Sequence, residues 1–220
     1  MRKTISNMLA ARAARRLEMS RAIDDLTFSV IDCEMTGLSP SKDELISIAG
    51  VHVRGAAIQI NERFDHMVCP ASFELADDNA VIHRLSHSRV EDGDDPAQVM
   101  AGLDDFLAGT VLVGHCVNCD IGFINPLRQA CDMTPLDTPV IDTLGIWQWY
   151  QLRLDRHRPV ERIPSRLQDI VESYDIPSFP AHDALGDVLT TACVLIKLLA
   201  EVHHAGLSTL GDLMRIGRPL

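Results

Sequence analysis

Two carboxylates stand two residues apart in the segment VIDCEMTGL, at Asp32 and Glu34. The segment is β-rich, and the period of two in a strand puts both carboxylates on one face and Cys33 on the other. Carboxylates about 4 Å apart repel by roughly 4 kcal/mol at an effective dielectric of about 20, so a fold keeps them when a cation or proton offsets that repulsion. Hard oxygen ligands favour magnesium or manganese. The pair therefore predicts a metal site, although exposed strand ends also carry two acids without one.

Three further residues could complete such a site. Asp120 follows a predicted strand and turn near the start of a helix, where a lone aspartate can also serve as a helix cap. His182 and Asp187 bracket the entry to the last helix in AHDALGDVL. Five helical residues turn through about 500°, so the two side chains would not share a helix face. We therefore expect His182 in the loop or first turn, where its imidazole can reach a water that Asp187 and its metal position; the alternative is a solvated loop histidine.

The segments around these residues predict an α/β domain. Strands are expected at 26–35, 44–54, 56–68, 110–115 and 138–144, with a tight turn at Gly55. Helices are expected at 95–107, 118–130, 145–154, 165–177 and 182–202, and Pro126 is expected to kink or restart the second. Residues 153–165 are expected to form a surface loop, and 204–220 an appended helix with a free tail. Three strands, followed by helices that alternate with two more strands, predict helices layered on a mixed sheet.

Length and composition indicate one domain with short extensions. The chain has 220 residues, of which 46% are hydrophobic, enough for one full core. We expect a basic N-terminal extension at 1–24, the main domain at 25–203 and a C-terminal tail at 204–220. The arginine-rich extension is also typical of organellar transit peptides, but a surface helix or loose extension is the preferred interpretation. Without an apolar run of about 18–20 residues or a secretory signal, we expect a cytoplasmic protein with no membrane partner.

Charge and cysteine content narrow the function. A net charge of −11 argues against a protein that coats long nucleic acid through a broad basic face. It does not exclude an enzyme that holds a strand end, because bound divalent cations reverse the local field. Six cysteines in core-like segments suit a reducing cytosol. Cys116 and Cys119 form a C-x-x-C, which without a second pair is a weak zinc signal; a redox pair is another interpretation.

Three segments together resemble one family, the DEDDh 3′–5′ exonucleases of the DnaQ-like superfamily, of the type of the DNA polymerase III epsilon proofreading subunit. Its first motif, D-x-E-T-T-G-L, is present as DCEMTGL; its second, H-N-x-x-F-D-x-x-F, as HCVNCDIGF; its third, H-x-A-L-x-D, unaltered as HDALGD. IHRLSHSRV resembles the family's I-H-G-I-T segment, and VIDTL its strand before the fourth helix. The resemblance covers residues 26–200. It implies a ribonuclease H-like fold, with a five-stranded mixed sheet flanked by helices.

Carried onto this sequence, the resemblance implies a 3′–5′ exonuclease domain that uses two divalent cations, Mg²⁺ or Mn²⁺, and releases nucleoside 5′-monophosphates. Asp32, Glu34 and Asp187 would hold one metal. Asp32 and Asp120 would place the second, and His182 would be the general base. Substrate contacts are implied at Met35, Thr36, Gly37, Leu38, His83, His115 and Phe123. The implied partners are the 3′ end of a nucleic acid and a DNA polymerase or other replication protein.

Several alternatives stay open at this point. Single-stranded DNA is the expected substrate, but DCEMTGL also resembles the oligoribonuclease branch, whose first motif is often D-x-E-M-T-G-L, so short RNA is the alternative. Cys116 and Cys119 replace the usual Asn and Phe of the second motif, so strand contacts can differ there. A catalytically silent, nucleic-acid-binding member should lack an acid or the histidine, whereas all five are present. QLRLD at 151–155 could be a clamp-binding peptide but more simply ends a helix, and Leu38 could pack in the core.

Overall fold

The computed structural model describes residues 18–69, 93–177, 179 and 184–219. The predicted sites at His83 and His182 lie outside these ranges, as do residues 1–17 of the predicted basic extension.

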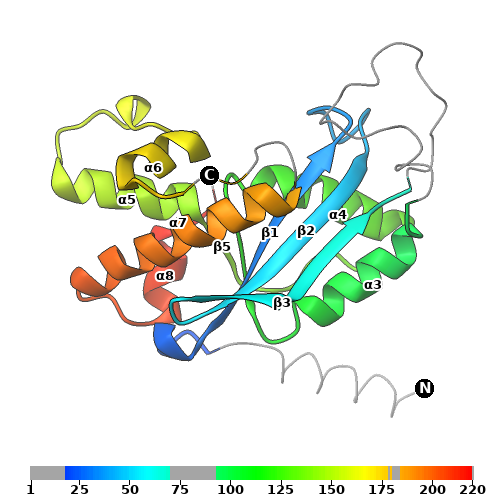
Figure 1. Ribbon diagram of the computed structural model, residues 1–220, viewed down its shortest axis with the longest axis horizontal. Helices are drawn as coiled ribbons and strands as arrows, with labels where there is room; N and C mark the ends of the chain where they lie inside the picture. Colours follow the sequence, from blue (N-terminus) through cyan, green and yellow to red (C-terminus); the bar gives the residue numbers. More distant parts are fainter. Residues whose placement is uncertain (1–17, 70–92, 178, 180–183, 220) are drawn as a thin grey trace.

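A five-stranded mixed sheet forms the centre of the structure (Figure 1). Its strands lie in the order β3 (Ala57–Met67), β2 (Leu45–Arg54), β1 (Thr27–Met35), β4 (Val111–Gly114) and β5 (Val140–Asp142). The first three pair antiparallel, whereas β4 pairs parallel with β1, and β5 parallel with β4. Gly55 joins β2 to β3 at a φ of +58°, a conformation that costs little only for glycine. The predicted mixed sheet and its turn are confirmed.

Six helices and two short 3₁₀ turns are described around the sheet, in residues 18–69, 93–177, 179 and 184–219. The helices are α3 (Pro96–Phe106), α4 (Asn118–Ala130), α5 (Thr143–Leu154), α6 (Leu167–Tyr174), α7 (Ala184–His204) and α8 (Leu210–Ile216). The 3₁₀ turns are Ile23–Asp25 and Val160–Arg162, the second within the predicted surface loop. The side chain of Asp95 accepts a hydrogen bond from the Ala97 N–H at 2.9 Å and caps α3. Pro126 lies inside α4 and does not end it.

Two hydrophobic layers follow from the alternation of side chains along β1. Val30 faces α7, which lies along one face of the sheet with α5, α6 and α8 (Figure 1). Ile31 faces the opposite layer, which α3 and α4 cover. The predicted α/β architecture with helices on both faces is confirmed, and it carries Asp32 and Cys33 to opposite sides of the same strand.

The C-terminal segment is part of the core. Leu210, Leu213 and Ile216 of α8 are buried in the same layer as α7, and the Gly217 carbonyl accepts a hydrogen bond from the Asp142 N–H at 2.8 Å. The expected helix is confirmed as α8, but the expectation that it is an appendage with a free tail is wrong, because its apolar residues at helical spacing are buried in the core. The functional division of the chain at 24 and 203 stays a prediction.

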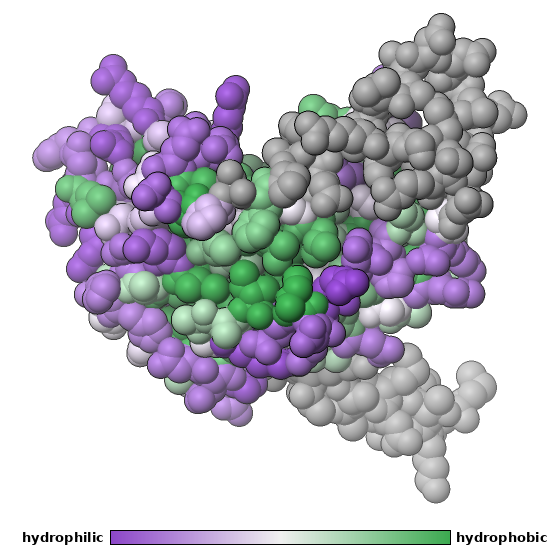
Figure 2. Space-filling view, in the orientation of Figure 1, coloured by the Kyte–Doolittle hydropathy of each residue, from purple (hydrophilic) through white to green (hydrophobic). Residues whose placement is uncertain are grey.

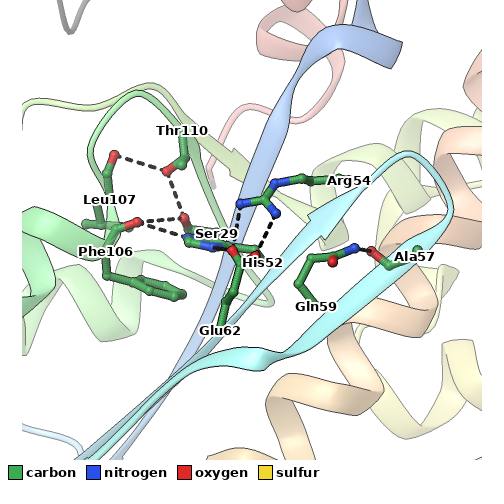
Figure 3. A network of polar contacts seen from close by, with 9 residues as sticks. All are labelled: Ser29, His52, Arg54, Ala57, Gln59, Glu62, Phe106, Leu107 and Thr110. Carbon is green, nitrogen blue, oxygen red and sulfur yellow. Dashed lines mark hydrogen bonds and ion pairs between the residues drawn. The ribbon is translucent and has the colours of Figure 1, made fainter.

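A polar network fixes the C-terminal end of α3 to the sheet (Figure 3). The two ring nitrogens of His52 lie 3.0 Å from the Phe106 carbonyl oxygen and 3.2 Å from Glu62 Oε2. Arg54 pairs with both oxygens of Glu62, and Ser29 Oγ lies 2.7 Å from Thr110 Oγ1. Three strands and one helix are thereby joined at the end of the sheet remote from Glu34 and Met35.

Apolar side chains also reach the surface beside α7. Figure 2 shows them in the middle of this face, over α7 and the adjoining strands. Leu185, Leu189 and Ile196 of α7 are partly buried against the core, as is Ile58 of β3, while Ile60 is 44% exposed. Among the described residues, no helix is both long and apolar enough to cross a membrane.

Candidate active site

Three carboxylates converge where β1 passes beneath the first turn of α7. Asp32 and Glu34 lie on the face of β1 that α7 covers, and Asp187 lies in the first turn of α7. Ligand oxygens of Asp32, Glu34 and Asp187 all lie within 4.8 Å of one another. The predicted proximity of Asp32 and Asp187, which are 155 positions apart, is thus produced by the packing of one helix on one strand.

The electrostatics of this cluster favour a bound cation. Burial raises the pKa of Asp32 well above its ordinary value, and the neighbouring carboxylates of Asp120, Asp187 and Glu34 raise it further. Glu34 is 7% exposed, so little water screens the group. Three hard oxygen donors that are close together, poorly solvated and mutually repelling fit a divalent cation such as Mg²⁺ or Mn²⁺.

Asp120 joins the cluster from the other layer of the molecule. It lies in the first turn of α4, 4% exposed, and its carboxylate accepts hydrogen bonds from the thiol and the backbone of Cys33. Burial raises its pKa to about 7, although these hydrogen bonds act in the opposite direction. Cys33 belongs to the layer of α3 and α4, as predicted from the strand period. Asp120 therefore reaches Asp32 around β1, and four carboxylates share one region.

The turn after β1 lies next to these carboxylates. Met35 is partly buried against the layer of α3 and α4, and the Thr36 N–H donates to the Glu44 carbonyl oxygen at 2.9 Å. Leu38 is 92% exposed, so the alternative in which it packs in the core is wrong. Gly37 faces the carboxylate of Asp43: a Cβ atom at residue 37 would lie 2.5 Å from Asp43 Oδ1.

Two residues of the second motif lie further from solvent. His115 Nε2 donates to the Ser165 carbonyl oxygen at 2.8 Å, and Nδ1 lies 3.0 Å from Thr143 Oγ1. Burial lowers the pKa of His115, which favours the neutral ring. Phe123 is 5% exposed and packs in the layer of α3 and α4. Both side chains have structural partners here, and their predicted contacts with substrate stay predictions, like those at His83 and His182.

Comparison with known proteins identifies the family of this chain. A family model described as Exonuclease matches residues 29–195, which include all the carboxylates above. The chain belongs to this exonuclease family. The predicted resemblance to DEDDh exonucleases of the epsilon type is confirmed.

Individual relatives of this exonuclease are longer proteins. The chain is 26% identical over 200 residues to the PolC-type DNA polymerase III of Bacillus subtilis, covering 90% of this chain and 13% of that one. It is 31% identical over 193 residues to a DNA polymerase III subunit epsilon-like protein of Rhodobacter capsulatus, covering 87% and 26%. Its fold is that of E. coli Exonuclease I in complex with a dT13 oligonucleotide, with a TM-score of 0.69, 21% identity and coverage of 83% and 43%. The exonuclease therefore spans a minor part of these relatives.

One buried carboxylate of the exonuclease was not predicted from the sequence to take part in the site. Asp142, 1% exposed at the end of β5, accepts hydrogen bonds from the N–H groups of Cys116, Val117 and Leu144 at 3.0, 3.1 and 2.9 Å. These bonds hold the turn that leads into α4, where Cys116 has a φ of +56°. Asp142 thus helps to position Asp120. The available signal was an aspartate at the end of an apolar strand in VIDTL.

Among the described residues, the cysteines of the second motif belong to no group of three or more side chains that could hold a metal. Burial raises the pKa of Cys116 to about 11 and also raises that of Cys119. Both thiols are free, and within the described ranges the carboxylates of Asp32, Glu34 and Asp187 are the one group arranged to hold a metal. Because a raised pKa disfavours the thiolate needed for zinc binding or thiol exchange, the geometry gives no support to the zinc or redox interpretation.

Proposed function

We propose that this exonuclease hydrolyses phosphodiester bonds one nucleotide at a time from the 3′ end, releasing nucleoside 5′-monophosphates. The observation that carries the proposal is the convergence of Asp32, Glu34 and Asp187 within 4.8 Å, with Asp120 close enough to raise the pKa of Asp32. Such a set of oxygens serves phosphoryl transfer, where charge builds up on the oxygens around phosphorus.

The carboxylates, His182 and the turn at 36–38 have separate roles in the proposed reaction. Asp32, Glu34 and Asp187 would hold one divalent cation, and Asp32 with Asp120 would hold a second. When bound, the cations supply electrostatic stabilisation of the developing charge and ease the loss of a proton from the attacking water. His182 accepts that proton, since an imidazole with a pKa near neutrality is suited to the step. The turn at 36–38 contacts the terminal nucleotides.

Single-stranded DNA is the proposed substrate. An Exonuclease I with the same fold is bound to a dT13 oligonucleotide, and several relatives are DNA polymerases III. A polymerase or other replication protein is therefore the proposed partner. Met35 favours a second candidate, short RNA, because the oligoribonuclease branch often has methionine at this position.

The test uses the purified chain with single-stranded DNA and RNA oligomers that carry a 5′ label, in Mg²⁺ or Mn²⁺. Product lengths should shorten stepwise from the 3′ end, a blocked 3′-hydroxyl should slow the reaction, and a blocked 5′ end should not. The relative rates on DNA and RNA assign the sugar preference. Cleavage into internal fragments, or full activity in excess chelator, would contradict the proposal.

A further inference from the structure

The exposed leucine of the β1–β2 turn lies beside the carboxylate cluster. Leu38 is 92% exposed and follows Glu34 by four residues. The same turn approaches α4, because a Cβ atom at Gly122 would lie 3.6 Å from Pro40 Cγ, and Asp120 lies two residues before Gly122. A large apolar side chain held in water at this position offers a surface for an apolar partner.

One carboxylate contacts both chain neighbours of Leu38. The Ser39 N–H donates to Asp43 Oδ2 at 2.8 Å. On the other side, the Cα of Gly37 packs so closely on the Asp43 carboxylate that a Cβ there would lie 2.5 Å from Oδ1. The Asp43 N–H also donates to the Ser39 carbonyl oxygen at 2.8 Å. Both residues that flank Leu38 thus contact the side chain of Asp43.

We propose that Asp43 is a positioning residue for the substrate strand: it fixes the turn so that Leu38 points outward as an apolar contact for the terminal nucleotides. The inference rests on the proposed function. Asp43 acts through Leu38 and does not itself touch substrate. A charge-assisted hydrogen bond is stronger than a neutral one, and a preorganised side chain loses less conformational freedom on binding. Removing the carboxylate should therefore weaken strand binding more than it slows the chemical step.

The experiment measures kcat, KM and the melting temperature on a 5′-labelled single-stranded oligomer. Asp43→Ala should raise KM about tenfold with kcat changed by less than about threefold, the pattern of lost binding. Asp43→Asn keeps an amide oxygen to accept from Ser39 and should stay within about threefold of wild type. Asp105→Ala removes an exposed carboxylate on α3 and serves as the charge-matched control. Asp43→Glu keeps the charge but pushes it into Gly37, and replaces Asp43→Ala if that variant does not fold.

A double variant separates this role from a general structural one. If Asp43 acts through Leu38, adding Asp43→Ala to Leu38→Ala should raise KM by no more than about twofold beyond Leu38→Ala alone. Losses that multiply, or a fall in kcat as large as the rise in KM, would overturn the inference. So would an unchanged KM in Asp43→Ala while the wild type cleaves from the 3′ end. A wild type that does not cleave from the 3′ end overturns the proposed function itself, and this inference with it.

Discussion

Cys33 and Asp120 interact across β1 at the candidate active site, where hydrogen bonding with the thiol and backbone of Cys33 lowers the pKa of the Asp120 carboxylate against the effect of burial. Cys33 points away from Asp32 and Glu34, into the layer of α3 and α4. Asp120 comes from that layer, so its carboxylate is oriented by the residue that separates the two strand acids. A buried thiol thereby supports the carboxylate proposed to place the second metal, as outer hydrogen-bond partners commonly do.

Cys33→Ala should weaken the metal site. Loss of the thiol donor raises the pKa of Asp120 further and frees its carboxylate to rotate, so the Mg²⁺ or Mn²⁺ concentration for half-maximal rate should rise about tenfold. Cys33→Ser keeps a hydrogen-bond donor, so its metal concentration for half-maximal rate should rise less. Titration of the rate with metal at fixed pH gives both values. Equal half-saturation in Cys33→Ala and wild type would show that the hydrogen bond does not matter for the site.

Asp32→Ala and Asp187→Ala should each abolish turnover while leaving the metal-free fold intact or slightly more stable. Each substitution removes a proposed metal ligand, and it also relieves repulsion among carboxylates that burial leaves poorly screened. Cleavage assays and thermal melts without metal measure the two effects, with Asp105→Ala as an exposed-carboxylate control. Activity within tenfold of wild type in either variant would remove that residue from the metal site.

Without metal, Asp120 should make the fold less stable as pH rises. Its pKa is about 7 when folded against an ordinary 3.8, so between these values the folded state binds more protons than the unfolded chain. The free energy of unfolding therefore falls across this window, and Asp32 acts in the same direction. His115, with a lowered pKa, contributes with the opposite sign just below its ordinary 6.5.

The difference between wild type and Asp120→Asn isolates the effect of Asp120. In chelator, the melting temperature of the Asp120→Asn variant minus that of wild type should rise steadily between pH 4 and 7. Added Mn²⁺ should raise the wild-type melting temperature more at the upper end of this window, where the ligands are ionised. A difference between the two proteins that does not vary with pH would contradict the raised pKa.

His182→Ala should lower the rate by about 10²–10⁴-fold while metal and strand still bind, because general-base assistance is lost. In the wild type the rate should climb somewhere between about pH 6 and 8, as the imidazole becomes neutral. That acidic limb should flatten in the variant. The pH–rate profiles of both proteins decide the matter: an unchanged profile at near-normal rate would leave another base, or bulk hydroxide, to take the proton.

The sequence alone was sufficient to predict the features of this protein that depend on the periodicity of a single strand or helix. The period of two in VIDCEM placed Asp32 and Glu34 on one face and Cys33 on the other, and the helical spacing over 95–107 and 182–202 predicted the helices α3 and α7. These patterns are local because one strand or one helix turn fixes which side chains share a face. The resemblance of the three motifs then supplied the fold and the order of the acids.

The tertiary structure decided which distant side chains meet. Three sets of contacts join residues whose pairing the sequence motifs did not predict. They are the interaction of Cys33 with Asp120, the hydrogen bonds from three backbone N–H groups to Asp142, and the close approach of Gly37 to Asp43. The same holds for α8, which the sequence predicted as an appended helix and which packs against α5 and β5 in the core. Long-range packing sets burial, and burial sets the pKa values of these carboxylates. Neither the burial of these carboxylates nor their pKa values can be predicted from the periodicity of the sequence.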